Sequence, residues 1–194
     1  MHLTLHITRN CNLRCDYCYA PPQGDHGMSL DTAKDCLRFG AESTNGSCGI
    51  IFFGGEPLLQ RQLILDTVAA AKELSKSGEG MFHFKITTNG VLLDHEFLDF
   101  SLENDLLIAM SLDGIREAHN LHRRLPGGGG TFDAIYPKFK MLLDARPYSS
   151  ILSVINPDTV EHLVDSVEFL LDEGARYLIM SLNYDAKWTE EDFG

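Results

Sequence analysis

The sequence predicts an α/β fold in which six parallel strands form a partial (β/α)6 barrel, with an open sheet as the alternative. Short runs of aliphatic and aromatic residues alternate along the chain with longer segments whose apolar residues recur every three or four positions, the pattern of strands joined by helices. The chain has 194 residues, room for six such units, whereas a closed eight-stranded barrel typically needs about 250. No linker divides the sequence, so residues 1–194 are predicted to form one domain.

Six aliphatic segments are the predicted strands. They are residues 2–8, 49–53, 82–88, 106–112, 150–155 and 177–182. Right-handed crossovers between them imply a parallel sheet. The first four are followed by a cysteine-rich loop, by "GGEP", by "NG" and by "DG". Because the chemistry of such folds belongs at the carboxyl ends of the strands, we expect the functional site there.

Helical periodicity predicts the segments between the strands. These are residues 29–44, 57–78, 94–104, 131–145 and 156–174. Ser29, Thr131 and Asn156 stand where helices begin and are residue types that cap helices. Pro137 falls about six positions into its segment, so we expect that helix to kink or to restart there.

Composition excludes several classes of partner and location. The formal net charge is −12 and no run of Lys or Arg occurs, which argues against nucleic acid as the main partner. No segment approaches the roughly 20 apolar residues of a membrane span, and the first residues lack the pattern of a signal peptide. Five cysteines without an export signal fit a reducing compartment, so we expect a cytoplasmic protein.

Three of the cysteines lie close together after the first predicted strand. Cys11, Cys15 and Cys18 are separated by three and then two residues. A disulfide uses two sulfurs and a closed zinc site usually takes four ligands, so three thiolates suggest a metal centre with one open position. Structural zinc with His2 or His6 as fourth ligand is the alternative, although both histidines lie within the predicted strand.

The cysteine spacing, with the aromatic Tyr17 before the last cysteine, resembles the signature of radical S-adenosylmethionine (radical SAM) enzymes. "GGEP" at residues 54–57 resembles the second motif of that superfamily. "TTNG", "SLDG" and "EAHNLHRRLPGGGGTFD" resemble the subgroup of sulfatase-maturating and peptide-modifying (SPASM-type) enzymes. The resemblance runs from Leu3 to about Tyr184, with the motifs in the expected order.

The resemblance implies two cofactors. Three thiolates would hold three irons of one [4Fe–4S] cluster, and the fourth iron would bind S-adenosylmethionine (SAM). In the resembled family an electron from the cluster breaks a carbon–sulfur bond of SAM, and the resulting 5′-deoxyadenosyl radical abstracts hydrogen. The protein's part is position, electrostatics and exclusion of water.

The resemblance also assigns residues to SAM. They are Tyr17, Gly54, Gly55, Glu56, Asn89, Ser111 and Arg123. Glu56 would accept from the methionine ammonium and Arg123 would bind its carboxylate, with Arg124 competing for that role. Gly54 and Gly55 would permit close backbone approach.

The remaining assignments rest on strand ends and on an aromatic ring. Ser111 and Asn89 could bond ribose or carboxylate oxygens, and Tyr17 resembles the aromatic residue whose neighbourhood meets the adenine. "NG" and "DG" are also generic turn dipeptides, and Glu56 alone could be an acid favoured by a helix dipole. Structural roles are therefore alternatives for these residues.

Peptide-modifying relatives usually continue into a cysteine-rich C-terminal domain with auxiliary clusters. Here no cysteine follows Cys48, so we expect one cluster and no such domain. Cys36 and Cys48 are expected to be buried, inert thiols.

The predicted function is a radical SAM enzyme core that abstracts hydrogen from a peptide or protein side chain. A flavodoxin or ferredoxin is the expected kind of electron donor. A small-molecule radical SAM enzyme, a glycyl-radical activase and a non-catalytic core that needs a partner are the alternatives.

Overall fold

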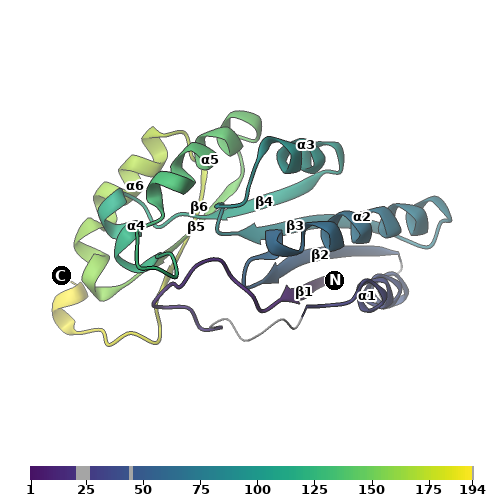
Figure 1. Cartoon of the computed structure of the whole chain (residues 1–194), viewed down its shortest axis with the longest axis horizontal. Coiled ribbons are helices and arrows are strands. Elements are labelled where there is room, and N and C mark those ends of the chain that lie inside the picture. The colour runs from purple at the N-terminus through teal and green to yellow at the C-terminus, as the bar shows by residue number, and fades with distance from the viewer. Residues whose placement is uncertain (21–26, 44–45, 194) are drawn as a thin grey trace. The chain divides into compact units, whose positions relative to one another are not determined.

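Six strands form one sheet in a computed structural model of the chain, in which residues 1–20, 27–43 and 46–193 are described. In their order across the sheet, which is also their order in the sequence, they are β1 (His2–Thr8), β2 (Ser47–Gly54), β3 (Met81–Thr88), β4 (Leu106–Ser111), β5 (Ser150–Ile155) and β6 (Tyr177–Leu182) (Figure 1). β1 with β2, β2 with β3, β4 with β5 and β5 with β6 pair in parallel. All six predicted strands are present.

Helices alternate with these strands, which confirms the predicted α/β class. The α-helices are α1 (Leu30–Ser43), α2 (Arg61–Lys76), α3 (His95–Glu103), α4 (Arg116–His122), α5 (Phe132–Ala145) and α6 (Leu163–Asp172). Shorter 3-10 helices are η1 (Pro57–Gln60), η2 (Pro157–His162) and η3 (Glu190–Phe193). The sequence does not predict α4, because seven residues are too few for a periodic apolar pattern.

Two predicted caps have different outcomes. Ser29 accepts from the backbone N–H three residues later, at 3.1 Å, as expected of a cap of α1. Thr131 precedes α5 but its side chain does not cap it, because its hydroxyl donates instead to the carbonyl of Arg123. The first N–H of α5, that of Phe132, donates to the Asn120 side chain at 2.9 Å. A residue far from the helix start in sequence therefore supplies the cap.

Two other helix expectations are wrong in part. α5 does not restart at Pro137, because the proline ring removes a single N–H while the buried face of the helix continues past it on both sides. The segment predicted as one helix from Asn156 begins instead as η2. There the Thr159 hydroxyl accepts from the Asn156 N–H and donates to its carbonyl, both at 3.1 Å, which closes a tight turn.

The described chain divides into two compact units. The first comprises Met1–Cys11, Ala20–Thr88 and Leu92–Ile108, and the second comprises Asn12–Tyr19, Asn89–Val91 and Ala109–Gly194. β4 contributes to both units. That residues 1–194 form one domain stays a prediction.

The core of the first unit lies on one face of β1, β2 and β3. Alternate strand residues are fully or nearly fully buried on this face: Leu5, Ile7, Ile50, Phe52, Phe84 and Ile86. α1 and α2 pack against these strands with their small and aliphatic residues, among them Ala33, Leu37, Ile64 and Val68. Residues of the opposite alternation line a cavity of about 330 Å³: Thr4, His6, Ile51, Phe53, Lys85 and Thr87. Alternate residues of these strands therefore point either to the face that α1 and α2 cover or to the opposite face, where the cavity lies.

The core of the second unit is aromatic. Phe132 stacks on Tyr136 with ring centroids 5.5 Å apart and lies 5.9 Å from Phe169 of α6. Ile151 of β5 and Leu170 of α6 are completely buried. Over the described residues, no helix is both long enough and apolar enough to cross a membrane.

Candidate functional site

The cysteine loop, residues 9–20, leaves β1 without forming a helix or strand. Its root, up to Cys11, belongs to the first unit and its middle, residues 12–19, to the second. In the middle the Cys18 N–H donates to the Cys15 carbonyl at 3.1 Å, which turns the chain around two residues. No cysteine of the loop is in a disulfide; Cys11 and Cys15 are half-buried and Cys18 is exposed.

The donor set of this loop fits an iron–sulfur cluster better than a closed zinc site. Within the described ranges, no three Cys, His, Asp or Glu side chains are gathered around a point that a single metal ion could occupy. His6, one candidate zinc ligand, instead packs its ring against Phe53 at 5.3 Å. Three thiols on an irregular loop suit three irons of a cluster, which spreads its ligands over several metal atoms.

The Gly54–Glu56 turn packs against the root of the cysteine loop. Gly54 has φ +137°, and a Cβ there would lie 2.2 Å from the Thr8 carbonyl oxygen. A Cβ on Gly55 would lie 2.2 Å from the Asn10 carbonyl oxygen. The Gly55 and Glu56 N–H groups donate to Thr8 and Asn10 at 2.9 and 2.8 Å. The close approach that the glycines permit is therefore made, in this structure, by the chain's own backbone.

Glu56 is completely buried at the carboxyl end of β2. Its Oε1 accepts from the Leu58 N–H at 2.9 Å, which caps η1, and from the Thr88 hydroxyl at 2.7 Å. Thr88 is the last residue of β3. Glu56 thus takes the structural role at the start of η1, and its role toward a cofactor stays a prediction.

Two predicted residues of the second unit differ in what they contact. The Asn89 amide donates to the side-chain oxygen of Asn12 in the cysteine loop at 2.8 Å, and its own oxygen accepts from the Val91 N–H at 3.1 Å. Asn89 thus stabilises the turn after β3 and also binds the cysteine loop. Ser111, at the end of β4, is half-buried, and its hydroxyl makes no hydrogen bond with the described part of the chain.

Tyr17 and Arg123, both predicted site residues, meet at a residue to which the sequence assigned no role. The Tyr17 hydroxyl donates to Oδ2 of Asp113 at 2.6 Å. Arg123 donates to the same carboxylate through Nε at 2.8 Å and Nη2 at 3.2 Å. Its guanidinium carbon lies 5.4 Å from the centre of the Tyr17 ring. Nη1 of Arg123 makes no hydrogen bond with the described residues, so one edge of the guanidinium is available to a ligand.

The charges of this trio are set by burial and by mutual contact. Burial raises the pKa of the Asp113 carboxyl, but the Arg123 guanidinium more than offsets this, so the pKa lies below its ordinary value. Burial, with Asp113 adding to it and Arg123 opposing it, raises the pKa of the Tyr17 phenol well above 10.0. At neutral pH Tyr17 therefore keeps its proton and donates to an ionised Asp113.

His119 supports this trio from α4. Its Nδ1 accepts from the Asp113 N–H at 3.3 Å, and Nε2 lies 2.9 Å from the Thr131 hydroxyl, which itself donates to the Arg123 carbonyl. Nδ1 is thus the acceptor of a neutral ring. Burial, and then the Arg123 charge, lower the pKa of His119 from 6.5 to about 4.

We expect the protein without its cofactors to lose stability as the pH falls from about 6.5 towards 4. In that window the unfolded chain binds a proton at His119 that the folded chain does not, so the free energy of unfolding falls by about 3 kcal/mol. Urea unfolding at several pH values checks this. A His119→Gln variant, which keeps one acceptor and one donor, should show a shallower pH dependence, whereas His95→Gln at the exposed start of α3 should match the wild type. Equal slopes for wild type and His119→Gln would contradict the expectation.

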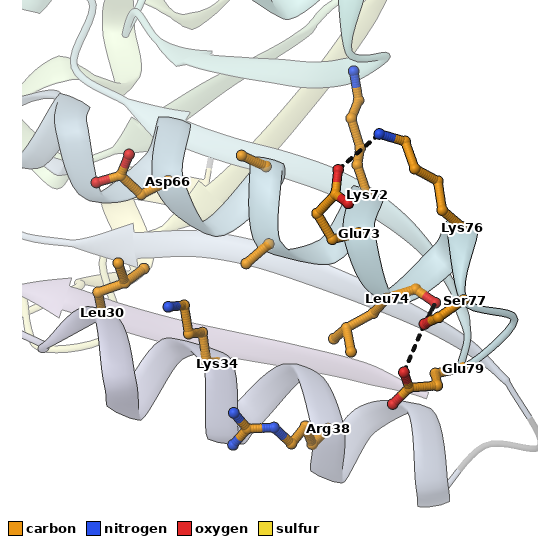
Figure 2. Close-up of a pocket in the computed structure, with 12 residues that line it drawn as sticks. Leu30, Lys34, Arg38, Asp66, Lys72, Glu73, Leu74, Lys76, Ser77 and Glu79 are labelled. Atoms are coloured by element: carbon orange, nitrogen blue, oxygen red, sulfur yellow. Dashed lines mark hydrogen bonds and ion pairs between the residues drawn. The ribbon is translucent and has the colours of Figure 1, made fainter.

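A groove of about 840 Å³ lies between α1 and α2 (Figure 2). It is lined by both signs of charge: Lys34 and Arg38 come from α1, and Asp66, Lys72 and Glu73 come from α2. The Lys76 ammonium lies 2.7 Å from Glu73 across one helical turn. None of the predicted site residues lines it, and it carries no thiol. We assign no chemistry to this groove.

The signal for Asp113 was present in the sequence. "SLDG" places an acid directly after a strand, but the dipeptide "DG" is also a common turn, so its acid was not singled out. Thr88 and Asn12 were missed because a threonine and an asparagine beside a motif carry no signal of their own. Their roles depend on Glu56 and Asn89, which only folding brings to them.

Comparison with known proteins places these features in a family. The model of the Radical SAM superfamily matches residues 5–170. The cysteine-type anaerobic sulfatase-maturating enzyme of Clostridium novyi (strain NT) is 27% identical over 177 residues, which cover 87% of this chain and 47% of that enzyme. Fe-coproporphyrin III synthase of Methanosarcina barkeri (strain Fusaro / DSM 804) is 36% identical over 130 residues, 66% of this chain and 30% of that enzyme. The chain thus spans about half or less of the length of these relatives.

A solved structure shows the same fold. Native anSMEcpe with bound AdoMet and Kp18Cys peptide matches with a TM-score of 0.88 at 22% identity, over 100% of this chain and 57% of that one. This likeness, together with six strands in sequential order, confirms the predicted partial barrel.

Proposed function

The chain belongs to the Radical SAM superfamily, and from this premise we propose that it is the core of a radical SAM enzyme that modifies a peptide or protein side chain. Cys11, Cys15 and Cys18 would hold one [4Fe–4S] cluster, with SAM as the second cofactor. The observation that carries the proposal is the cysteine loop, with three thiols outside disulfides and a root packed on the Gly54–Glu56 turn. When bound, the cluster would supply one-electron reducing chemistry to SAM.

The chain's own residues have distinct parts in this proposal. Glu56 accepts from the SAM ammonium, and its burial strengthens a charge-assisted hydrogen bond there. The remaining edge of the Arg123 guanidinium binds the SAM carboxylate, while the Ser111 hydroxyl serves the ribose or the carboxylate. The Tyr17 hydroxyl is hydrogen-bonded to Asp113, so the part of Tyr17 that we propose to contact the adenine is its ring.

A peptide substrate is supported by two of the similar proteins. One is named for sulfatase maturation and the other was solved with a peptide bound. We further propose a flavodoxin or ferredoxin as electron donor and a cytoplasmic location. The substrate-specific part of the activity is proposed for the whole protein rather than for this chain alone.

The test is anaerobic turnover. Reconstituted protein with a strong reductant should release 5′-deoxyadenosine from SAM. With the whole protein, adding the Kp18Cys peptide should accelerate release and change the peptide's mass. A chain that binds SAM and a cluster but releases no 5′-deoxyadenosine would be the non-catalytic core instead.

A small-molecule enzyme is the second candidate, because one similar protein is Fe-coproporphyrin III synthase. Turnover stimulated by a porphyrin and not by peptide would favour it. A glycyl-radical activase would instead leave a stable protein radical on its target.

Glu56→Gln should weaken SAM binding about tenfold to a hundredfold, because it removes a charge-assisted hydrogen bond. Gln keeps an oxygen that can accept from Leu58 and Thr88, so the fold and the iron content should be unchanged. Equilibrium dialysis of SAM against cluster-loaded protein measures the effect. Glu103→Gln, at the exposed end of α3, is the matched control. Equal SAM affinities for the two variants would show that Glu56 does not bind the SAM ammonium.

A further inference from the structure

We infer that Asp113 is a positioning residue for the cysteine loop: its carboxylate holds the hydroxyl of Tyr17 and thereby the segment that carries Cys15 and Cys18. The inference deepens the proposed function. It rests on that function only for the identity of the group that the cysteines bind. The positioning itself is a property of the chain without cofactors.

Tyr17 is well placed to transmit position to both cysteines. It follows Cys15 by two residues and precedes Cys18 directly, and the Cys18 N–H to Cys15 carbonyl bond closes the turn in which it sits. Its hydroxyl is 2.6 Å from Asp113 Oδ2, although the two residues are 96 positions apart in sequence. Fixing the end of this side chain therefore fixes the tip of the turn.

Asp113 is a rigid anchor because its carboxylate is fully used. Oδ1 accepts from the Val154 N–H at 3.0 Å and from Arg123 Nη2, and Oδ2 accepts from Arg123 Nε and from Tyr17. Two acceptances at each oxygen are the capacity of an ionised carboxylate. The side chain is only 3% exposed, and the backbone N–H of Asp113 donates to His119. With no acceptor left for a substrate, Asp113 is a positioning residue and not a base.

Side chains and backbone groups also attach the loop in this unit. The Asn12 side-chain oxygen accepts from the Asn89 amide at 2.8 Å, and the Asp16 carboxylate lies 3.5 Å from Nδ1 of His122. The Arg14 N–H donates to the Arg124 carbonyl at 2.8 Å, and the Asp16 N–H donates to the His122 carbonyl at 3.3 Å. These bonds attach residues 12, 14 and 16, which all precede Tyr17. Loss of the Tyr17 hydroxyl should therefore loosen residues 17 and 18 and expose Cys15, while α5 and the sheet stay folded.

The experiment compares Tyr17→Phe and Asp113→Asn with wild type and with Tyr19→Phe. Tyr19 is on the same loop and is 70% exposed. Protein without cofactors is kept reduced and anaerobic, and alkylation of each cysteine by iodoacetamide is followed by peptide mass spectrometry. Backbone hydrogen exchange of residues 12–19 and of α5 is measured alongside. Tyr17→Phe loses one hydrogen bond to a charged group, so we expect roughly tenfold faster alkylation at Cys15 and faster exchange of residues 12–19.

Cys36 on α1 and the exchange of α5 serve as internal references, because a general loss of stability would accelerate both. Asp113→Asn should act in the same direction as Tyr17→Phe; if it unfolds the protein, Tyr17→Phe decides alone. Cys15 alkylation and loop exchange equal to those of Tyr19→Phe would overturn the inference, as would acceleration at Cys36 and α5 to the same extent. Failure of the proposed function would give a different result. The wild type would then incorporate no iron, while Tyr17→Phe would still accelerate Cys15 alkylation and exchange of the loop.

Discussion

Cys11→Ala, Cys15→Ala and Cys18→Ala proteins are each expected to contain no [4Fe–4S] cluster. We propose that these three thiolates are the only protein ligands of the cluster. Losing any one of them leaves one iron without a protein ligand, and a chelator should then remove the cluster. Wild-type protein reconstituted anaerobically should hold about four irons and four sulfides. Iron and sulfide analysis, together with the charge-transfer absorbance of the cluster, measures the difference.

Cys36→Ala is the matched control for these variants. Cys36 lies half-buried on α1, outside the cysteine loop, so its replacement should leave the iron content intact. Cys48 is a poorer control, since it is 1% exposed and packs tightly enough that a Cβ on Gly40 would lie 2.7 Å from its sulfur. Its loss should lower stability without lowering iron per folded molecule. Stoichiometric zinc without charge-transfer absorbance in the wild type would overturn the cluster assignment.

Arg123→Ala is expected to destabilise the protein without cofactors by about 3–5 kcal/mol, the second large effect. The change leaves Asp113 buried without its cationic partner, and breaking a buried ion pair from one side costs far more than the pair contributes. Tyr17 and the Val154 N–H still donate to the carboxylate but supply no charge. Urea unfolding at pH 7.5 under reducing conditions measures the loss.

Arg124→Ala is the control, because Arg124 is half-buried and makes no side-chain ion pair with the described residues. Its effect should stay within about 0.5 kcal/mol. Equal destabilisation by the two variants would show that breaking the Asp113–Arg123 pair does not cause the loss of stability. The pair also changes how SAM binding should be tested: a weaker affinity in Arg123→Ala follows from loss of the ion pair as well as from loss of a SAM ligand. Arg123→Lys, which keeps the charge, separates the two causes.

Much of this protein could be predicted from local sequence. The six strands and most of the helices follow from periodicity, because side chains repeat every two residues along a strand and every 3.6 along a helix. The positions of the cysteines, of "GGEP" and of "NG" after successive strands indicate where the site lies, because a parallel sheet brings those ends to one edge. The family follows from the same short motifs, which are contiguous in sequence.

The tertiary structure alone decided which groups share a hydrogen bond. The sequence offered Arg123 as a ligand for a carboxylate, and the fold brings it the carboxylate of Asp113. Thr131 was expected to cap α5, yet the fold turns its hydroxyl to the Arg123 carbonyl and leaves the cap to Asn120. Such choices depend on residues far apart in the chain, 96 positions in the case of Tyr17 and Asp113. A polar side chain will bond whichever partner folding brings within about 3 Å, and no local pattern encodes that distance.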